Sequence, residues 1–448
     1  ALASIVSEMK AGNIDTVVMV GVNPVYTAPA GLDFEDALSK VNTVVTLSDY
    51  VDETAKKAAW HVNRSHFLEA WGDGFSFGGA RSVIQPQIQP LHNGLSEIEF
   101  LNTITTGSLS QGYNLVQDTF KGYYRSGFDK RWTKILHDGI DTLNNYNTVS
   151  VRVASGFASA MNRATKNASS VSGIEITIRP DATLYDGRYA NLGWLQELPD
   201  PMTKITWDNV ALMSPNTAKK LGVGDYIFGE AEADIIEINS NGVKLKIAAW
   251  IQPGHADDSI TLTAGYGRKG IGRVASSYID YLAGGVDVYP LRKTADMFYA
   301  QATATKIGET YEIACVQDHQ SMEGRDIFRQ GTLKDYKGNP QFAAFSTVHG
   351  YEVPGMKEAE AKGEDQPISL FDEQTYPDYE PQWGMAIDLN SCFGCGVCMI
   401  ACQSENNVPV IGKREVRRGR EMHWIRNDRY YVGDDAKDPQ AVHMPVPC

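Results

Sequence analysis

The chain contains the stretch Cys392-Phe393-Gly394-Cys395-Gly396-Val397-Cys398-Met399-Ile400-Ala401-Cys402, in which four of its six cysteines lie within eleven residues. Iron–sulfur clusters are held by thiolates, and the two-residue spacings present three sulfurs to one cluster. In ferredoxins with two clusters the fourth cysteine of such a run ligates the other cluster, so we expect Cys402 to serve a neighbouring one. The spacing predicts a ferredoxin-like iron–sulfur domain over residues 383–448.

Two other uses of clustered cysteines fit this spacing less well. Zinc ribbons use two CxxC pairs separated by a dozen or more residues, and disulfide frameworks space their cysteines through the chain. The ferredoxin run usually continues with proline, whereas Gln403 follows here. Cys448 is either a free thiol or, as we favour, the first cysteine of a second cluster motif. Cys315 lies in an apolar run and is expected to be a buried core residue.

Residues 174–345 have the pattern of short β-strands. Polar and apolar side chains alternate in several segments, which is typical of strands with one buried face. The segments are Ile174–Ile178, Tyr226–Phe228, Ile235–Ile238, Val243–Ile247 and Ser259–Leu262. Ser240-Asn241-Gly242 predicts a hairpin turn, and Thr217–Leu221 predicts a short helix that ends at Gly222. The pattern predicts a small closed barrel.

Residues 1–173 have an α/β pattern. Strands are predicted at Thr16–Val20 and Val41–Leu47, and helices at Leu32–Lys40 and Glu53–Trp60. This order predicts a parallel sheet covered by helices. Two segments follow in the sequence, an extended surface excursion over Trp71–Pro90 and a largely helical region over residues 94–145.

Charge and hydropathy restrict the class of protein. The formal net charge is −14, which would repel a nucleic-acid backbone, and no apolar run is long enough for a membrane-spanning helix.

Nine acidic residues between 352 and 380 indicate an acidic linker over 346–382. The basic residues between Lys413 and Arg420 are expected to form a solvated face. Two alternatives are that they balance the negative charge of the cluster or that they contact an acidic partner. The chain has no initiator Met or signal peptide, and we expect it to be an interior piece of a longer polypeptide.

Several segments resemble one known family. Gly21–Pro24, Asp52–Ala55 and Leu68–Asp73 resemble the third domain of molybdopterin oxidoreductases. Two further segments, Asn191–Pro201 and Thr206–Asn209, resemble the entry to the last domain of these enzymes. The double-psi β-barrel of that domain is resembled by three segments, Ser214–Ala218, Leu221–Asp225 and Gly265–Arg268. The fusion of these segments to a cysteine run, with Gln317–Arg325 before the linker, resembles the large iron–sulfur subunits of bacterial Alternative Complex III.

This resemblance implies an electron-transfer subunit without a catalytic site of its own. It implies [4Fe–4S] clusters and a [3Fe–4S] cluster, with Cys392, Cys395, Cys398, Cys402 and Cys448 as the ligands within this chain. It also implies that molybdopterin is absent, although the residue that would bind molybdenum would lie before Ala1. The implied fold is an α/β molybdopterin-oxidoreductase-like domain (1–173), a double-psi barrel (174–345), the linker and the start of the ferredoxin-like domain.

The partners implied are an integral membrane quinol-oxidising subunit, multihaem and monohaem cytochrome c subunits, and a terminal oxidase. The location implied is the periplasmic face of the bacterial inner membrane, reached through these partners. One alternative is a catalytically active molybdopterin oxidoreductase, of the polysulfide-reductase kind, fused to its own iron–sulfur relay. A further hypothesis, compatible with the first, treats residues 1–310 as a scaffold for neighbouring subunits.

Overall fold

The computed structural model describes residues 1–124, 126–141, 149–166, 173–224, 232–240, 242–275, 284–294, 298–317, 319–325, 327–340, 342–343, 347–348, 351–352, 381, 383–433 and 435–447. The chain forms two compact units. Unit 1 comprises residues 1–173, 269–276 and 288–301, and unit 2 comprises 174–268, 277–287 and 302–448. The division into the segments 1–173, 174–345, 346–382 and 383–448 stays a prediction.

Unit 1 begins with a parallel sheet in the order β1-β2-β3, formed by Thr16–Val20, Thr43–Ser48 and Trp60–Asn63. Val45 of the central strand pairs with Val18 on one side and with Trp60 on the other. The predicted parallel sheet is therefore confirmed. The elements between the strands are α1 (Leu2–Lys10), α2 (Pro24–Thr27), η1 (Ala30–Leu32), α3 (Phe34–Leu38) and η2 (Ala55–Lys57).

The helix predicted over Glu53–Trp60 is wrong. Only the 3-10 turn η2 forms there, and Ala58 is already extended, with φ −86° and ψ 145°. Trp60 then opens strand β3, because pairing with β2 satisfies its backbone groups in place of helical hydrogen bonds. The helix predicted over Leu32–Lys40 is shorter than expected. Asp33 has a left-handed φ of 48° and separates η1 from α3.

The second part of unit 1 is an antiparallel sheet with three helices. Strands β4 (Gly72–Phe75), β5 (Arg81–Ile84) and β6 (Ile140–Asp141) pair in that order. The extended excursion predicted over Trp71–Pro90 contains a β-hairpin that the sequence pattern did not predict. Helices α4 (Glu97–Thr106), α5 (Gly112–Lys121) and α6 (Phe128–Asp138) confirm the helical region, and α7 (Phe157–Lys166) follows. Their core includes Val116, Phe120 and Trp132.

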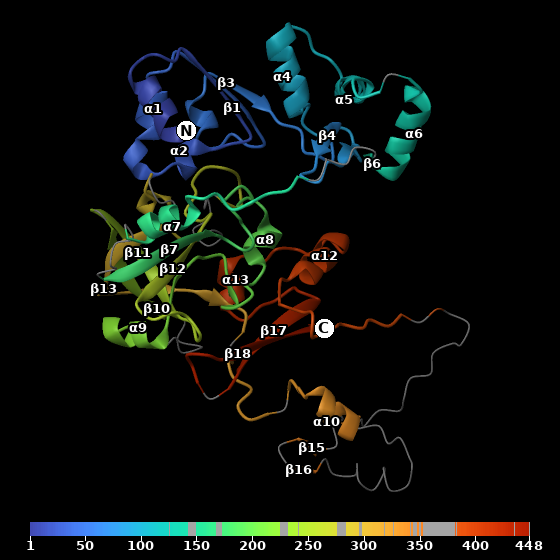
Figure 1. The fold of residues 1–448 in the computed structure, drawn as a ribbon. Helices are drawn as coiled ribbons and strands as arrows, with labels where there is room; N and C mark the ends of the chain where they lie inside the picture. Colours follow the sequence, from blue (N-terminus) through green and yellow to red (C-terminus); the bar gives the residue numbers. More distant parts are fainter. Residues whose placement is uncertain are drawn as a thin grey trace. The chain divides into compact units, whose positions relative to one another are not determined.

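Unit 2 contains a closed six-stranded barrel in the order β10-β11-β9-β12-β7-β13 (Figure 1). The strands are β7 (Ile174–Pro180), β9 (Ala211–Met213), β10 (Glu232–Ser240), β11 (Val243–Ile251), β12 (Ser259–Ala264) and β13 (Tyr299–Glu312). β7 pairs in parallel with β12 and β9 with β11, whereas β10–β11, β10–β13 and β9–β12 are antiparallel. The predicted closed barrel is confirmed.

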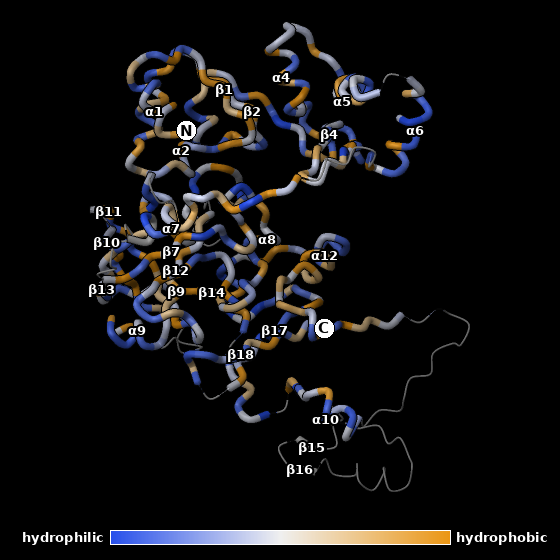
Figure 2. Tube along the Cα trace, in the orientation of Figure 1, coloured by the Kyte–Doolittle hydropathy of each residue, from blue (hydrophilic) through white to orange (hydrophobic). Residues whose placement is uncertain are grey.

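The alternation found in the sequence positions the core of the barrel. Ile176, Ile236, Ile238, Ile260 and Leu262 are fully buried. Figure 2 shows hydrophobic residues gathered along β7, β9 and β12. Helix α9 (Pro215–Leu221) ends at Gly222, whose φ of 70° permits the left-handed cap, so the predicted short helix is confirmed. The strand predicted at Tyr226–Phe228 and Asn241 of the hairpin turn lie outside the described residues.

The remaining elements of unit 2 place the cysteine run. Helix α8 (Gly193–Glu197) and strands β8 (Ile205–Thr206) and β14 (Ala314–Cys315) come from the barrel region, followed by α10 (Leu333–Gly338), β15 (Thr347–Val348) and β16 (Tyr351–Glu352). α12 (Val397–Glu405) and α13 (Lys413–Arg417) precede the long antiparallel hairpin of β17 (Ile425–Val432) and β18 (Gln440–Pro447). The short 3-10 helix η3 (Tyr289–Leu291) belongs to unit 1.

Candidate functional site

The cysteine run lies on a loop that leads directly into helix α12. Cys392 and Cys395 are on the loop, and Cys398 and Cys402 are on the helix, one turn apart. All four thiols are free; Cys395 and Cys398 are exposed, and Cys392 and Cys402 are half-buried. In the described part of the chain, no three His, Cys, Asp or Glu side chains are arranged as a metal-binding set. Ligation by these cysteines therefore stays a prediction.

The loop has the backbone that a cluster-binding turn needs. Gly394 and Gly396 adopt φ values of 77° and 75°, a left-handed conformation that side-chain-bearing residues rarely adopt. Asp388 closes the turn before them: its backbone oxygen accepts a hydrogen bond from the Cys392 nitrogen at 3.1 Å, and its carboxylate accepts one from Ser391 Oγ at 2.8 Å. The local sequence thus shapes a tight loop that carries two thiols.

Neighbouring residues leave no room for side chains at these glycines. A Cβ on Gly396 would lie 2.9 Å from Leu198 Cδ1, and a Cβ on Gly394 would overlap the ring of His443. Leu198 follows helix α8, and His443 belongs to strand β18. The loop therefore packs between a residue of the barrel region and the C-terminal hairpin. Close contact with the His443 ring adds to the φ requirement at Gly394, whereas at Gly396 the φ is the main requirement, because the end of the Leu198 side chain can shift.

The thiols influence one another electrostatically. Partial desolvation raises the pKa of the Cys398 thiol although the residue as a whole is exposed, and the nearby Cys395 and Cys392 raise it further. The Asn406 amide lies 3.6 Å from Cys402 Sγ and can donate a hydrogen bond to that sulfur. Hydrogen bonds to sulfur are one of the means by which proteins adjust the reduction potential of a cluster. A set of mutually close thiols with such a donor fits iron–sulfur ligation in its chemistry.

Helix α8 holds the segment that follows α12. The buried Glu197 carboxylate accepts hydrogen bonds from the backbone nitrogens of Gly412 at 2.8 Å and Ile411 at 3.2 Å. Trp194 Nε1 donates to the Val408 oxygen at 2.6 Å. Burial raises the pKa of Glu197, while the two backbone donors act in the opposite direction. These contacts tie the cysteine-bearing segment to residues more than 200 positions earlier in the sequence.

A buried ion pair makes a second connection to the barrel region. Lys413 Nζ lies 2.7 Å from Asp208 Oδ2, and the side chain of Asp208 is fully buried. Tyr311 OH donates to Asp208 Oδ1 at 2.9 Å and lies 2.7 Å from Lys413 Nζ. Burial raises the pKa of Asp208, and Lys413 opposes that rise. Lys413 is therefore a structural cation and not part of a solvated face.

The other basic residues of this stretch are also paired. Arg414, Arg418 and Arg420 all contact the carboxylate of Glu415, and Arg417 contacts Glu312. Three guanidinium groups around one carboxylate leave a net positive surface on α13. The prediction of a solvated face fits these arginines, whose side chains are largely exposed.

The structure also places the remaining cysteines that the sequence singled out. Cys315 is buried in β14, where its thiol lies 3.3 Å from the Gln317 oxygen, so its prediction as a core residue is confirmed. Cys448 and most of the acidic linker lie outside the described residues. The sequence pattern did not indicate Glu197, Lys204, Arg429 or His443 as neighbours of the cysteine run. No local motif could have indicated them, because they meet only through the tertiary fold.

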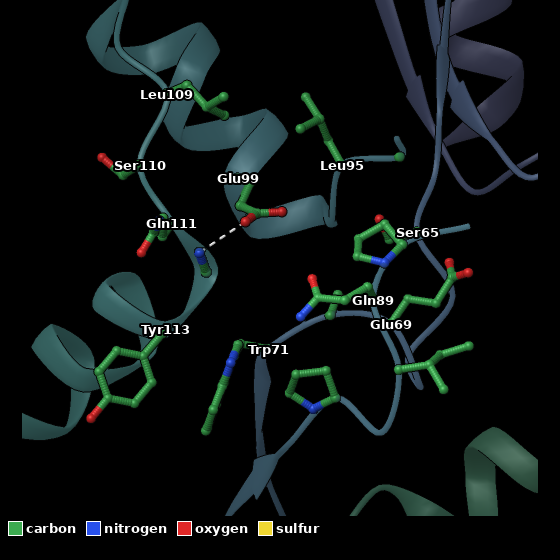
Figure 3. A pocket seen from close by; sticks show the side chains of 16 residues that line it. Ser65, Glu69, Trp71, Gln89, Leu95, Glu99, Leu109, Ser110, Gln111 and Tyr113 are labelled. Carbon is green, nitrogen blue, oxygen red and sulfur yellow. Dashed lines mark hydrogen bonds between the residues drawn. The ribbon is translucent and has the colours of Figure 1, made fainter. Parts of the chain in front are cut away.

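Unit 1 has a cavity of about 390 Å³, lined by residues between Ser65 and Tyr113 (Figure 3). The two carboxylates labelled there are already engaged. Glu99 accepts a hydrogen bond from the Gly112 nitrogen at 2.8 Å and caps α4, while Glu69 accepts from the Leu91 nitrogen at 3.0 Å. The polar groups of this cavity thus stabilise the local fold.

No helix in the described part of the chain is both long and apolar enough to cross a membrane.

Comparison with known proteins gives two sequence relatives. The menaquinone reductase iron–sulfur cluster-binding subunit of Nitratidesulfovibrio vulgaris (strain Hildenborough) is 31% identical over 74 residues, which are 16% of this chain and 29% of that subunit. The arsenate respiratory reductase iron–sulfur subunit ArrB of Chrysiogenes arsenatis is 58% identical over 26 residues, 6% of this chain and 87% of that sequence. The chain thus spans less than a third of the first relative.

No protein-family model matches the chain. Among solved structures, acetylene hydratase from Pelobacter acetylenicus has a TM-score of 0.45 and 12% sequence identity, and the similarity covers 68% of this chain and 46% of that one. A similarity of this size carries no argument about function, and the molybdopterin-oxidoreductase-like fold stays a prediction.

Proposed function

Because the chain belongs, over the part that the comparisons cover, to the iron–sulfur subunits of respiratory reductases, we propose that it is the electron-transfer subunit of a quinol-oxidising complex of the Alternative Complex III type. The observation that carries this proposal is the cysteine run on its two-glycine loop. Four thiols at ferredoxin spacing on a backbone without room for extra side chains suit a bulky inorganic cofactor.

The residues of this chain bind and position. Cys392, Cys395 and Cys398 would hold one [4Fe–4S] cluster, and Cys402 and Cys448 would contribute ligands to neighbouring clusters. The ferredoxin-like part as a whole would also carry a [3Fe–4S] cluster. When bound, such a cluster accepts and releases one electron at a time. Leu198 and His443 pack against the loop and fix its position, and Asn406 donates to the Cys402 sulfur. The chain itself supplies no acid, base or nucleophile in this proposal.

The partners proposed are a membrane subunit that oxidises quinol and cytochrome c subunits that receive the electrons, with a terminal oxidase beyond them. The subunit would lie at the periplasmic face of the inner membrane, attached through these partners. The N. vulgaris relative is by its name a subunit of a menaquinone reductase, which supports assembly with other subunits.

The closed barrel is compatible with a double-psi architecture, because its strands form both parallel and antiparallel pairs. We propose that this barrel is retained as a scaffold and binds no molybdopterin. The competing function is an active molybdopterin oxidoreductase fused to its own iron–sulfur relay. The observation that favours this alternative is the same barrel. Molybdenum or tungsten in stoichiometric amount in the purified complex would refute the scaffold proposal.

A cysteine substitution tests the electron-transfer proposal. We expect Cys395→Ser to lose the low-temperature EPR signal of one cluster and about four iron atoms per chain. The matched control is Cys315→Ser, because Cys315 is a buried thiol of the same unit that the proposal assigns no ligand role. The control should keep its iron. Bound zinc and no EPR signal in the unaltered complex would contradict the proposal.

A further inference from the structure

Three cationic or basic side chains are buried together beside the cysteine loop. Arg429 and His443 are direct cross-strand partners in the β17–β18 hairpin, so their side chains share one face of it. Lys204 joins them from the barrel region, because Arg429 Nε donates to the oxygen of nearby Met202 at 2.7 Å. Lys204, Arg429 and His443 are only 2%, 1% and 8% exposed.

Arg429 donates hydrogen bonds to Met202 and Gln320, but neither Arg429 nor Lys204 has a carboxylate partner among the described residues. Arg429 Nη1 and His443 Nδ1 are buried without a hydrogen-bond partner. Among the described residues, no carboxylate lies within ion-pairing distance of Lys204 or Arg429. The two nearest aspartates are engaged elsewhere. Asp200 accepts hydrogen bonds from the nitrogens of Met202 and Thr203, and Asp428 pairs with Arg426.

The backbone conformation of Lys204 and the pKa shifts of these side chains indicate that burying them together costs folding free energy. Lys204 has a left-handed φ of 62°, which is uncommon for a residue with a side chain and concentrates at functional sites. Burial lowers the pKa of Lys204 to about 8, and Arg429 contributes to that decrease. Burial also lowers the pKa of His443 to about 4, with Lys204 and Arg429 contributing. An anion nearby would offset this cost.

The cysteine loop supplies the place for such an anion. His443 packs directly against Gly394, which lies between Cys392 and Cys395. A cluster held by thiolates carries negative charge, and that charge grows by one when the cluster is reduced. Because the attraction between charges is stronger at any given distance in a medium of low dielectric constant, cations one residue layer away still act on it.

We propose that Lys204 and Arg429, with the uncharged ring of His443 between them and the loop, form a cationic cradle that balances the negative charge of the iron–sulfur cluster on the Cys392–Cys398 loop and raises its reduction potential. The inference depends on the proposed function, since it requires a cluster at that loop. It assigns to Lys204, a residue of the barrel region, a positioning and tuning role for an electron carrier nearly 200 residues further along the sequence.

Redox titration of the purified complex, followed by low-temperature EPR, tests this inference. We expect Lys204→Met to make reduction of this cluster about tenfold less favourable, a midpoint about 59 mV more negative for a one-electron couple. Lys204→Arg keeps the charge and should keep the potential. Lys220→Met is the control, because that lysine is exposed and paired with Asp258 at 2.6 Å; it should leave the potential unchanged.

The outcomes separate the inference from the proposed function. An unchanged potential in Lys204→Met, with iron content and EPR signal intact, overturns the cradle and leaves the electron-transfer function standing. Absence of any cluster signal in the unaltered complex overturns both. If Lys204→Met fails to assemble the cluster, Lys204→Arg decides: assembly with the arginine supports the charge role, and failure of both variants assigns Lys204 a packing role and overturns the cradle.

Discussion

Gly394 and Gly419 have the same backbone φ of 77°, but their surroundings differ. A Cβ on Gly394 would overlap His443, whereas a Cβ on Gly419 would meet nothing within 4 Å. Gly419→Ala therefore costs only the left-handed conformation, about 1 kcal/mol. We expect Gly394→Ala to cost a further 1–3 kcal/mol or so from overpacking, and to lower iron content. Urea unfolding and iron analysis of both variants measure this, and equal costs would show that the loop does not press on His443.

Lys204 gives a prediction about pH. Its pKa is lowered from 10.5 to about 8, so between these values the folded protein binds fewer protons than the unfolded chain. Stability should therefore rise with pH across this window, and the buried ammonium should destabilise the folded protein below it. In iron-free protein we expect Lys204→Met to be more stable by roughly 2–3 kcal/mol near pH 7, with the difference vanishing above about pH 10. A difference that is constant with pH, measured by urea unfolding, would contradict this.

At the scale of elements, the connection between α13 and the segment between β8 and β9 depends on a buried charge pair. Removing one partner of such a pair leaves the other charge buried alone, which costs about 3–5 kcal/mol. We therefore expect Asp208→Leu alone to destabilise unit 2 strongly, because Lys413 would lose its carboxylate, and Lys413→Met alone to do so because Asp208 would lose its ammonium partner. The double variant Asp208→Leu with Lys413→Met should recover most of that loss. Denaturant unfolding of the single and double variants measures the coupling, and additive costs would show that the pair is not coupled.

At the scale of the whole molecule, the barrel and the cysteine-bearing segment belong to one compact unit. Gly193, the first residue of α8, faces Val410: an added Cβ would lie 2.9 Å from Val410 Cγ2. We expect Gly193→Ala to loosen β12 and the β17–β18 hairpin together, because contacts such as Glu197–Gly412 would shift. Hydrogen exchange of both regions tests this. Adding Val410→Ala should restore protection, and loss confined to the hairpin would show that the two parts unfold independently.

The sequence by itself determined the local features. Strand alternation predicted the barrel, and the cysteine spacing predicted a cluster-binding loop, because side-chain periodicity and ligand spacing are properties of neighbouring residues. The sequence pattern failed at Glu53–Trp60, where strand pairing across 15 residues with Val45 outweighed a helical preference. Sequence-based predictions for short segments fail in this way most often, because pairing with a neighbouring strand contributes more hydrogen bonds than a short helix can.

Only the tertiary structure brought together the residues around the cysteine loop. Lys204, Arg429 and His443 are separated by more than 200 positions at the extremes, and no spacing rule connects them. Their meeting depends on the register of the β17–β18 hairpin and on how Glu197 and Asp208 hold the segment to the barrel region. Burial then gives the charges of Lys204 and Arg429 their effect, because a charge removed from water interacts strongly with any charge near it.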